Sequence, residues 1–319
     1  MKKLLFPVLF FGLFCFITAL LIFSGNISGQ GYERFANCII LAEQSEPQIA
    51  IVEQETGNMV WNWKPAEQIS NPEHVKWFSN PSDVKLVYGG NYVLMTASGG
   101  ACALIRICDK KMMFYAKAGH NPHSAEILPD GNIVCAASTG NSLTVFRTDT
   151  LSFPENVVQR SFHSPSSHNV VWDQKRNLLW TAELNQIRSW KYNLDCDDPQ
   201  LLPVDSLAFD DTEGHDLFPV PGEDALYFST VHKMWIFHIA ENRIEEVKSE
   251  YSNIKSISSS ARGKQPIITV PKEQWWTDEI IGLDGKTVFY HEGMKIYKAR
   301  WTVPNAFSYP ENHRIKMCR

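Results

Sequence analysis

Short stretches of β-type residues, in which apolar and polar positions alternate, follow one another from about residue 37 to the end of the 319-residue chain. Residues 119–138 show the pattern, because apolar side chains stand two apart on either side of the turn Pro129-Asp130-Gly131. Alternation with a period of two is typical of strands, and Pro-Asp-Gly favours a turn, so this segment predicts a hairpin. No convincing stretch has the 3.6-residue periodicity of a helix, and we therefore predict an all-β fold.

The predicted strands form repeating groups. Four strands recur in units of roughly 40–50 residues, and three successive units begin at His123, His168 and His215. This period is typical of a β-propeller, in which each four-stranded antiparallel sheet is one blade. We predict six blades in a single domain over residues 31–319. The first group has only three strands, at residues 37–43, 48–53 and 59–63, and needs a fourth.

The last residues of the chain can supply the missing strand. Residues 313–318 share with 82–87 and 252–257 a polar pair, then a β-branched residue, then Lys. We therefore expect a C-terminal strand to close the ring inside blade 1, which removes the open sheet edges. The same alignment places Cys318 beside Cys38, where either a disulfide or two buried thiols would fit.

The N-terminus predicts export. Met1-Lys2-Lys3 precedes an almost unbroken apolar run over residues 4–23, so residues 1–30 form a signal peptide or, since the run could span a bilayer, an uncleaved anchor. We expect a periplasmic or cell-surface protein that meets the membrane only through this segment. The net charge of −5 does not favour a nucleic-acid partner.

Residues 51–61 resemble the tryptophan-docking repeat of quinoprotein dehydrogenases, in which an acidic residue and Thr-Gly precede Trp, here Glu55-Thr56-Gly57 and Trp61. In that family the Thr-Gly turn joins the third and fourth strands, and the Trp packs between blades. The match covers one blade, so no quinone cofactor is expected. From Asn37 onward, the stretches ETGNMVWNWKP, HSAEILPDGNIV and KIYKARW make the chain similar to uncharacterised exported six-bladed propellers of Bacteroidetes.

Four histidines align at the start of predicted inner strands, which line the channel of a propeller: His123, His168, His215 and His313. One interpretation is a ring at one mouth of the channel that binds a ligand or a divalent transition metal, because neutral imidazole is a common metal ligand. The other is that these histidines hydrogen-bond within their blades or merely line the channel. Repetition of the histidine from blade to blade favours a structural role. Blades 2 and 6 have serine at the same position, so a blade does not need histidine there, and this favours a functional role.

Loops expected on the same face add further candidate ligand-binding residues, namely Glu183, His232, Trp275 and Trp276. Adjacent tryptophans can offer flat faces to sugar rings, although one of such a pair can instead wedge between blades.

Three functions remain open. The leading hypothesis is a propeller that binds a small ligand, such as a glycan, at the histidine ring. The second is a metal-dependent lyase or hydrolase of polysaccharide fragments, and the third is a protein-interaction scaffold. The sequence has no nucleophile elbow, phosphate loop or HExxH motif that would identify a class of enzyme. It therefore does not decide whether the protein is an enzyme.

Overall fold

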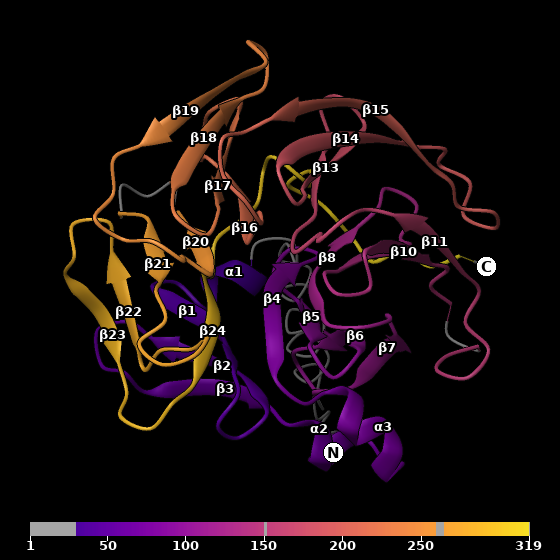
Figure 1. The fold of residues 1–319 in the computed structure, drawn as a ribbon. Helices are drawn as coiled ribbons and strands as arrows, with labels where there is room; N and C mark the ends of the chain where they lie inside the picture. Colours follow the sequence, from indigo (N-terminus) through magenta and orange to yellow (C-terminus); the bar gives the residue numbers. More distant parts are fainter. Residues whose placement is uncertain (1–29, 150–151, 260–264, 319) are drawn as a thin grey trace, which may run out of the picture.

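Six four-stranded antiparallel sheets form a ring in the computed structural model, which describes residues 30–149, 152–259 and 265–318 (Figure 1). The predicted six-bladed β-propeller is therefore confirmed. From the channel outward, blade 1 contains β24 (Ile296–Trp301), β1 (Cys38–Glu43), β2 (Gln48–Glu53) and β3 (Met59–Trp63). Blade 2 contains β4 (Pro81–Val87), β5 (Tyr92–Ala97), β6 (Ala101–Arg106) and β7 (Met112–Lys117).

The other blades have the same order from inside to outside. Blade 3 contains β8 (Pro122–Ile127), β9 (Ile133–Ala137), β10 (Ser142–Phe146) and β11 (Gln159–His163). Blade 4 contains β12 (Val171–Asp173), β13 (Leu178–Ala182), β14 (Gln186–Tyr192) and β15 (Leu201–Ala208). Blade 5 contains β16 (Asp216–Pro219), β17 (Ala225–Ser229), β18 (Met234–His238) and β19 (Arg243–Val247). Blade 6 contains β20 (Ser256–Ser258), β21 (Ile267–Thr269), β22 (Glu279–Gly282) and β23 (Thr287–Tyr290).

The last strand of the chain, β24, closes the ring as the inner strand of blade 1. It pairs antiparallel with β1, so that Leu41 lies opposite Ala299. Closure by the C-terminal strand was predicted, but its position was wrong, because the closing strand is β24 and residues 313–318 form no strand. Blade 6 already has four strands that end at Tyr290, which leaves the next strand for blade 1.

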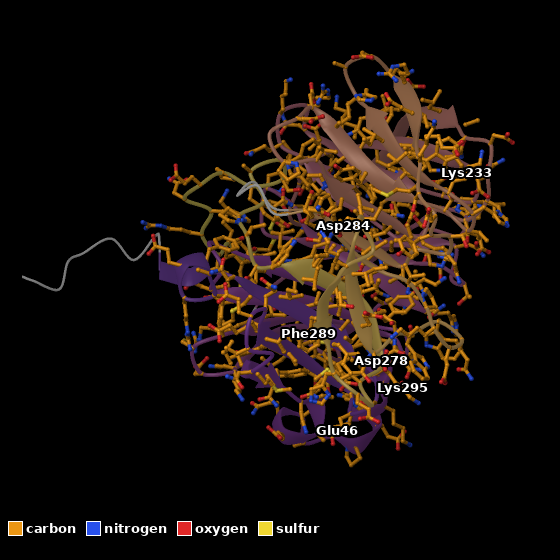
Figure 2. All side chains as sticks on the ribbon, turned by 90° about the vertical axis from the view of Figure 1, so that its left-hand side faces the viewer. Glu46, Lys233, Asp278, Asp284, Phe289 and Lys295 are labelled. Carbon is orange, nitrogen blue, oxygen red and sulfur yellow. A yellow bond between two sulfur atoms is a disulfide. The ribbon has the colours of Figure 1, made fainter. Side chains whose placement is uncertain are left out.

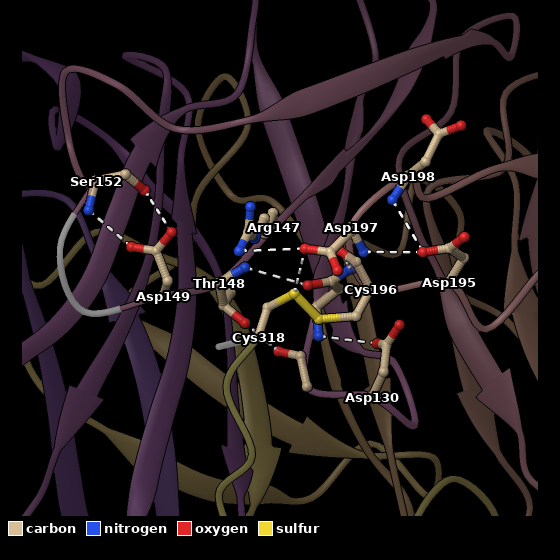
Figure 3. Close-up of a disulfide and its surroundings, with 12 residues drawn as sticks. Asp130, Arg147, Thr148, Asp149, Ser152, Asp195, Cys196, Asp197, Asp198 and Cys318 are labelled. Atoms are coloured by element: carbon tan, nitrogen blue, oxygen red, sulfur yellow. Dashed lines mark hydrogen bonds and ion pairs between the residues drawn. A yellow bond between two sulfur atoms is a disulfide. The ribbon is translucent and has the colours of Figure 1, made fainter.

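The segment after β24 crosses one face of the ring. Its backbone carbonyl at Ala306 accepts a hydrogen bond from Gln174, and the hydroxyl of Tyr309 accepts one from the backbone N–H of Ile127. It ends in a disulfide between Cys318 and Cys196, with Cα atoms 5.8 Å apart (Figure 3). The predicted Cys38–Cys318 pair is therefore wrong, because residues 313–318 do not pair with β1.

Trp61 packs between neighbouring blades, as the tryptophan-docking repeat implies. Its indole N–H donates to the backbone carbonyl of Ile107 at the edge of blade 2, over 3.1 Å. The preceding turn joins β2 to β3 and requires a positive φ of 73° at Gly57, which glycine adopts without steric cost.

The two faces of the ring differ in what covers them. The short helix α1 (Gln30–Glu33) lies on one face, at the left of Figure 2, whereas Lys233 and Lys295 lie toward the other. Helices α2 (Pro65–Gln68) and α3 (Pro72–Trp77) connect blades 1 and 2.

No helix of the described residues is long and apolar enough to cross a membrane. The predicted signal or anchor lies, except for Gln30, outside those residues.

Candidate ligand site at the channel mouth

Charged side chains fill the channel at the centre of the ring. Because successive side chains of a strand point to opposite faces, Lys298 and Arg300 of β24 share the channel face, as do Asp83 and Lys85 of β4. Lys298, Arg300 and Asp83 are at most 2% exposed at their side chains. The inner strands therefore bury charge on their channel face, whereas the middle strands of the blades bury mainly apolar residues.

Three cations and three carboxylates of the channel pair with one another. The carboxylate of Asp216 lies 2.6 Å from Arg300 and 3.1 Å from Lys298. Arg300 also reaches Asp83 at 3.0 Å, and Lys85 lies 3.2 Å from Glu126. Buried charges persist only when they are compensated in this way.

Burial alone would raise the pKa of Asp83, but the neighbouring cations Arg300, Lys298 and Lys85 lower it to about 2. A carboxylate whose pKa is lower in the folded than in the unfolded protein adds stability above its unfolded pKa. We therefore expect the protein to lose stability as the pH falls from about 4 to about 2. Urea unfolding at several acidic pH values measures this, and Asp83→Asn should flatten the profile across that range. An unchanged slope in Asp83→Asn would contradict the assignment.

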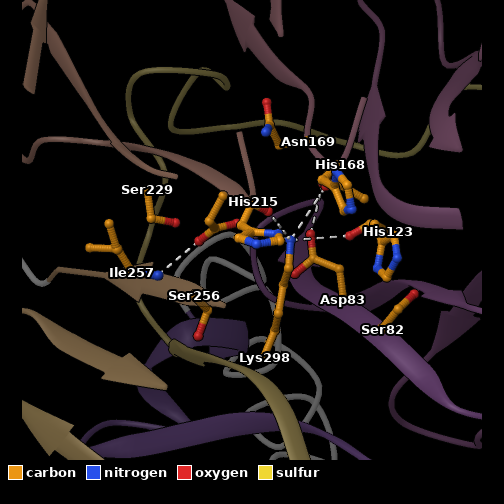
Figure 4. A network of polar contacts seen from close by, with 12 residues as sticks. Ser82, Asp83, His123, His168, Asn169, His215, Ser229, Ser256, Ile257 and Lys298 are labelled. Atoms are coloured by element: carbon orange, nitrogen blue, oxygen red, sulfur yellow. Dashed lines mark hydrogen bonds and ion pairs between the residues drawn. The ribbon is translucent and has the colours of Figure 1, made fainter. Parts of the chain in front are cut away.

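Three of the four predicted histidines meet at one mouth of this channel. The ring centroids of His123 and His168 are 4.7 Å apart, and those of His168 and His215 are 5.1 Å apart. Their backbone carbonyls converge on the amine of Lys298, which lies 3.2 to 3.4 Å from them (Figure 4). All three side chains are nearly buried.

The environment keeps these imidazoles uncharged. Burial, reinforced by the neighbouring lysines, places the pKa of His123 and of His215 well below the usual value. Burial likewise lowers the pKa of His168 to about 4. Among the described residues, the Nδ1 atoms of His123 and His215 are buried and have no hydrogen-bond partner. Such atoms are costly to leave unsatisfied, so the described side chains leave the polar groups of this cluster incompletely paired.

Lys255 contacts His215, one of the three histidines, and the sequence interpretation missed this contact. Its amine lies 3.1 Å from Nε2 of His215 and 2.6 Å from Oδ1 of Asn253. Burial, reinforced by the charge of Lys298, lowers the pKa of Lys255 to about 8, although Glu213 acts against this. The available signal was a lysine three residues after the predicted start of an inner strand at residue 252.

His313 does not belong to this group, which corrects the predicted ring of four. Its imidazole stacks on Tyr309 at 4.5 Å between ring centroids and also packs on Tyr88. Because the closing strand is β24 rather than residues 313–318, the position at the channel mouth falls to β24. There Tyr297 packs against His123 at 5.3 Å between ring centroids.

The other predicted site residues have partners of their own. His232 is exposed and bonds Asp211, whereas Glu183 is buried and bonds Ser164, Gln186 and Arg188. Trp275 is 44% exposed and donates its indole N–H to Gln44, and the amine of Lys295 lies over the ring of Trp276. Within the described residues, no hydrogen bond, ion pair or aromatic ring contact joins these side chains to the three histidines.

In residues 30–149, 152–259 and 265–318, no group of three or more His, Cys, Asp or Glu side chains is arranged to hold a metal ion. The histidine cluster instead contains two amines, those of Lys255 and Lys298. Positive charge repels a divalent cation and attracts an anion.

A cavity of 660 Å³ lies at the opposite end of the channel, and the sequence did not suggest it. Turns that follow the inner strands and the segment after β24 form its wall, which includes Phe218, Val303 and Phe307. The guanidinium of Arg300 lies 4.8 Å from the ring of Phe218, so the charged channel begins directly behind this apolar wall.

Solved structures with the same fold include a protein of unknown function from Bacteroides caccae, with a TM-score of 0.56 and 17% identity over 82% of this chain and 97% of that one. A functionally unknown protein from Desulfotomaculum acetoxidans gives a TM-score of 0.47 at 12% identity, over 82% of this chain and 98% of that one. The hydrazine synthase of Kuenenia stuttgartiensis gives 0.48 at 14% identity, over 65% and 64%.

No curated protein matches the sequence. A family model described as a family of unknown function, DUF6528, matches residues 15–319, and the chain therefore belongs to that family.

Proposed function

We propose that the protein binds a small carboxylate-bearing ligand, such as an acidic sugar, at the mouth formed by His123, His168, His215 and Lys255. The observation that carries this proposal is the extra cation. The three other cations of the channel pair with its three carboxylates. Lys255, by contrast, contacts only the neutral side chains of His215 and Asn253, and no carboxylate of the described residues lies within 4.0 Å of its amine. A ligand carboxylate would supply the missing anion.

The histidines suit the same ligand. Their low pKa values keep the imidazoles neutral at neutral pH, so each ring has one N–H and one accepting nitrogen. Two of these groups are already used, because His168 bonds the backbone carbonyl of Ser166 through Nδ1 and His215 bonds Lys255 through Nε2. The remaining groups suit a ligand that carries hydroxyl groups as well as a carboxylate. The disulfide between Cys196 and Cys318 favours an oxidising compartment, as we propose for an exported protein.

Titration calorimetry with galacturonate and with galactose tests the proposal. We expect galacturonate to bind and galactose not to bind. Lys255→Met should weaken galacturonate binding by about tenfold or more, because a charge-assisted hydrogen bond contributes roughly 1.5–3 kcal/mol. Above pH about 8 the affinity should fall as Lys255 loses its proton, and this dependence should vanish in Lys255→Met.

Lys76→Met is the matched control, since Lys76 is an exposed lysine on α3 that pairs with Glu73. Equal binding of the two sugars, or equal effects of the two substitutions, would refute the proposal. Loss of binding in Trp275→Ala but not in Lys255→Met would move the site to the tryptophan loop.

A further inference from the structure

Lys255 has the surroundings of a nucleophilic lysine. Its amine touches two hydrogen-bond acceptors, the imidazole of His215 and the amide oxygen of Asn253, over 3.1 and 2.6 Å. A neutral amine that donates its two N–H groups to these acceptors keeps its lone pair available. Lysines that form Schiff bases are activated by burial or by a neighbouring cation, and Lys255 has both, because its side chain is buried near Lys298.

We propose that Lys255 forms a reversible imine with a small oxo acid, a ligand with both a carboxylate and an aldehyde or ketone, at the mouth lined by His123, His168 and His215. The inference rests on the proposed function for its carboxylate. The protonated form of Lys255 pairs with that carboxylate, the neutral fraction attacks the carbonyl group, and the imine, once protonated, keeps the positive charge at the same position. The inference adds an aldehyde or ketone to the carboxylate that the proposed function already requires of the ligand. The open-chain form of a uronic acid has both groups.

The step conserves atoms and requires no oxidant or reductant. The lone pair of Nζ attacks the carbonyl carbon, and a proton passes from nitrogen to oxygen to give a carbinolamine. Loss of that oxygen as water then leaves a carbon–nitrogen double bond. His215 touches Nζ and is neutral, so its imidazole can accept the proton from nitrogen and return it to the departing hydroxyl.

The neutral fraction of Lys255 sets the expected reactivity. With a pKa of about 8, Lys255 has at pH 7.5 roughly a hundredfold more neutral amine than an unperturbed lysine. Burial restricts access to the amine, so a small probe is needed and the gain in rate is smaller than this ratio.

Reductive trapping with glyoxylate and cyanoborohydride at pH 7.5 tests the inference. Peptide mass spectrometry counts the carboxymethyl groups left on each lysine. We expect Lys255 to be labelled at least about tenfold faster than the exposed Lys76 and Lys286. Glycolate has the carboxylate of glyoxylate but a hydroxyl group in place of the aldehyde. It should therefore compete with glyoxylate and slow labelling at Lys255 only. His215→Gln should slow labelling at Lys255 while the melting temperature is retained.

Labelling of Lys255 no faster than that of Lys76 overturns the inference. If galacturonate then still binds in a Lys255-dependent way, the proposed function stands without the imine. Fast labelling that glycolate does not slow refutes a carboxylate site at this mouth, and with it the oxo acid. Because trapping and competition use the unsubstituted protein, misfolding of a variant cannot decide the result.

Discussion

Replacing Asp216 with alanine should lower the free energy of unfolding by about 3–5 kcal/mol, the usual cost of breaking a buried ion pair from one side. Both oxygens of this carboxylate bind Arg300, and one of them also binds Lys298. The substitution leaves two cations at the centre of the ring with only part of their compensating charge, and it removes the acceptor of the Ile257 backbone N–H. Urea unfolding followed by tryptophan fluorescence measures the loss.

Glu46→Ala is the matched control. This substitution also removes an ion pair, the one between Glu46 and Lys64, but that pair is exposed on the surface of blade 1. Water solvates both of these charges, so the control should change stability little. If Asp216→Ala were equally mild, the channel charges would not hold the blades together.

Cys318→Ser should cost about 2–4 kcal/mol of unfolding free energy, because the disulfide to Cys196 closes a loop with a sequence separation of 122 residues. The bond fixes the end of the segment that lies beneath blades 2, 3 and 4, where Tyr309 and Lys316 bond blade 3. Reduction with dithiothreitol should destabilise the unsubstituted protein by a similar amount and leave Cys318→Ser unchanged.

Cys108→Ser provides the comparison, since Cys108 is an exposed cysteine outside the disulfide. It should unfold like the unsubstituted protein under oxidising and reducing conditions alike. Identical midpoints for Cys318→Ser and Cys108→Ser would show that the disulfide contributes no stability.

Most strands could be predicted because they pair with strands that are their neighbours in the sequence. Strand β2 was expected at residues 48–53 and is found at Gln48–Glu53, since alternation and the flanking turns determine its bounds. The closing strand could not be assigned in this way. The pattern of residues 313–318 resembles an inner strand, but strand pairing between distant segments depends on the whole ring, and β24 pairs with a strand more than 250 residues earlier.

The histidine cluster was predicted in part for the same reason. His123, His168 and His215 repeat at matching positions in adjacent blades, so an alignment of blades brings them together. Lys298 and Arg300 belong to β24, which was not the strand predicted to close the ring, and alternating charge in a strand normally indicates a solvated face. The partner of Cys318 was beyond reach, because cysteine spacing alone does not determine connectivity.

The position of β24 near the end of the chain has a consequence for synthesis. Asp83 and Asp216 leave the ribosome before Lys298 and Arg300, so the two carboxylates must wait for their main cationic partners until the closing strand arrives. Until then the axis of the nascent ring carries uncompensated negative charge, which favours water in the channel and opposes early closure of the blades. A chain truncated before Ile296 would therefore lack both the closing strand and the counter-charges, and should remain an open, protease-sensitive arc.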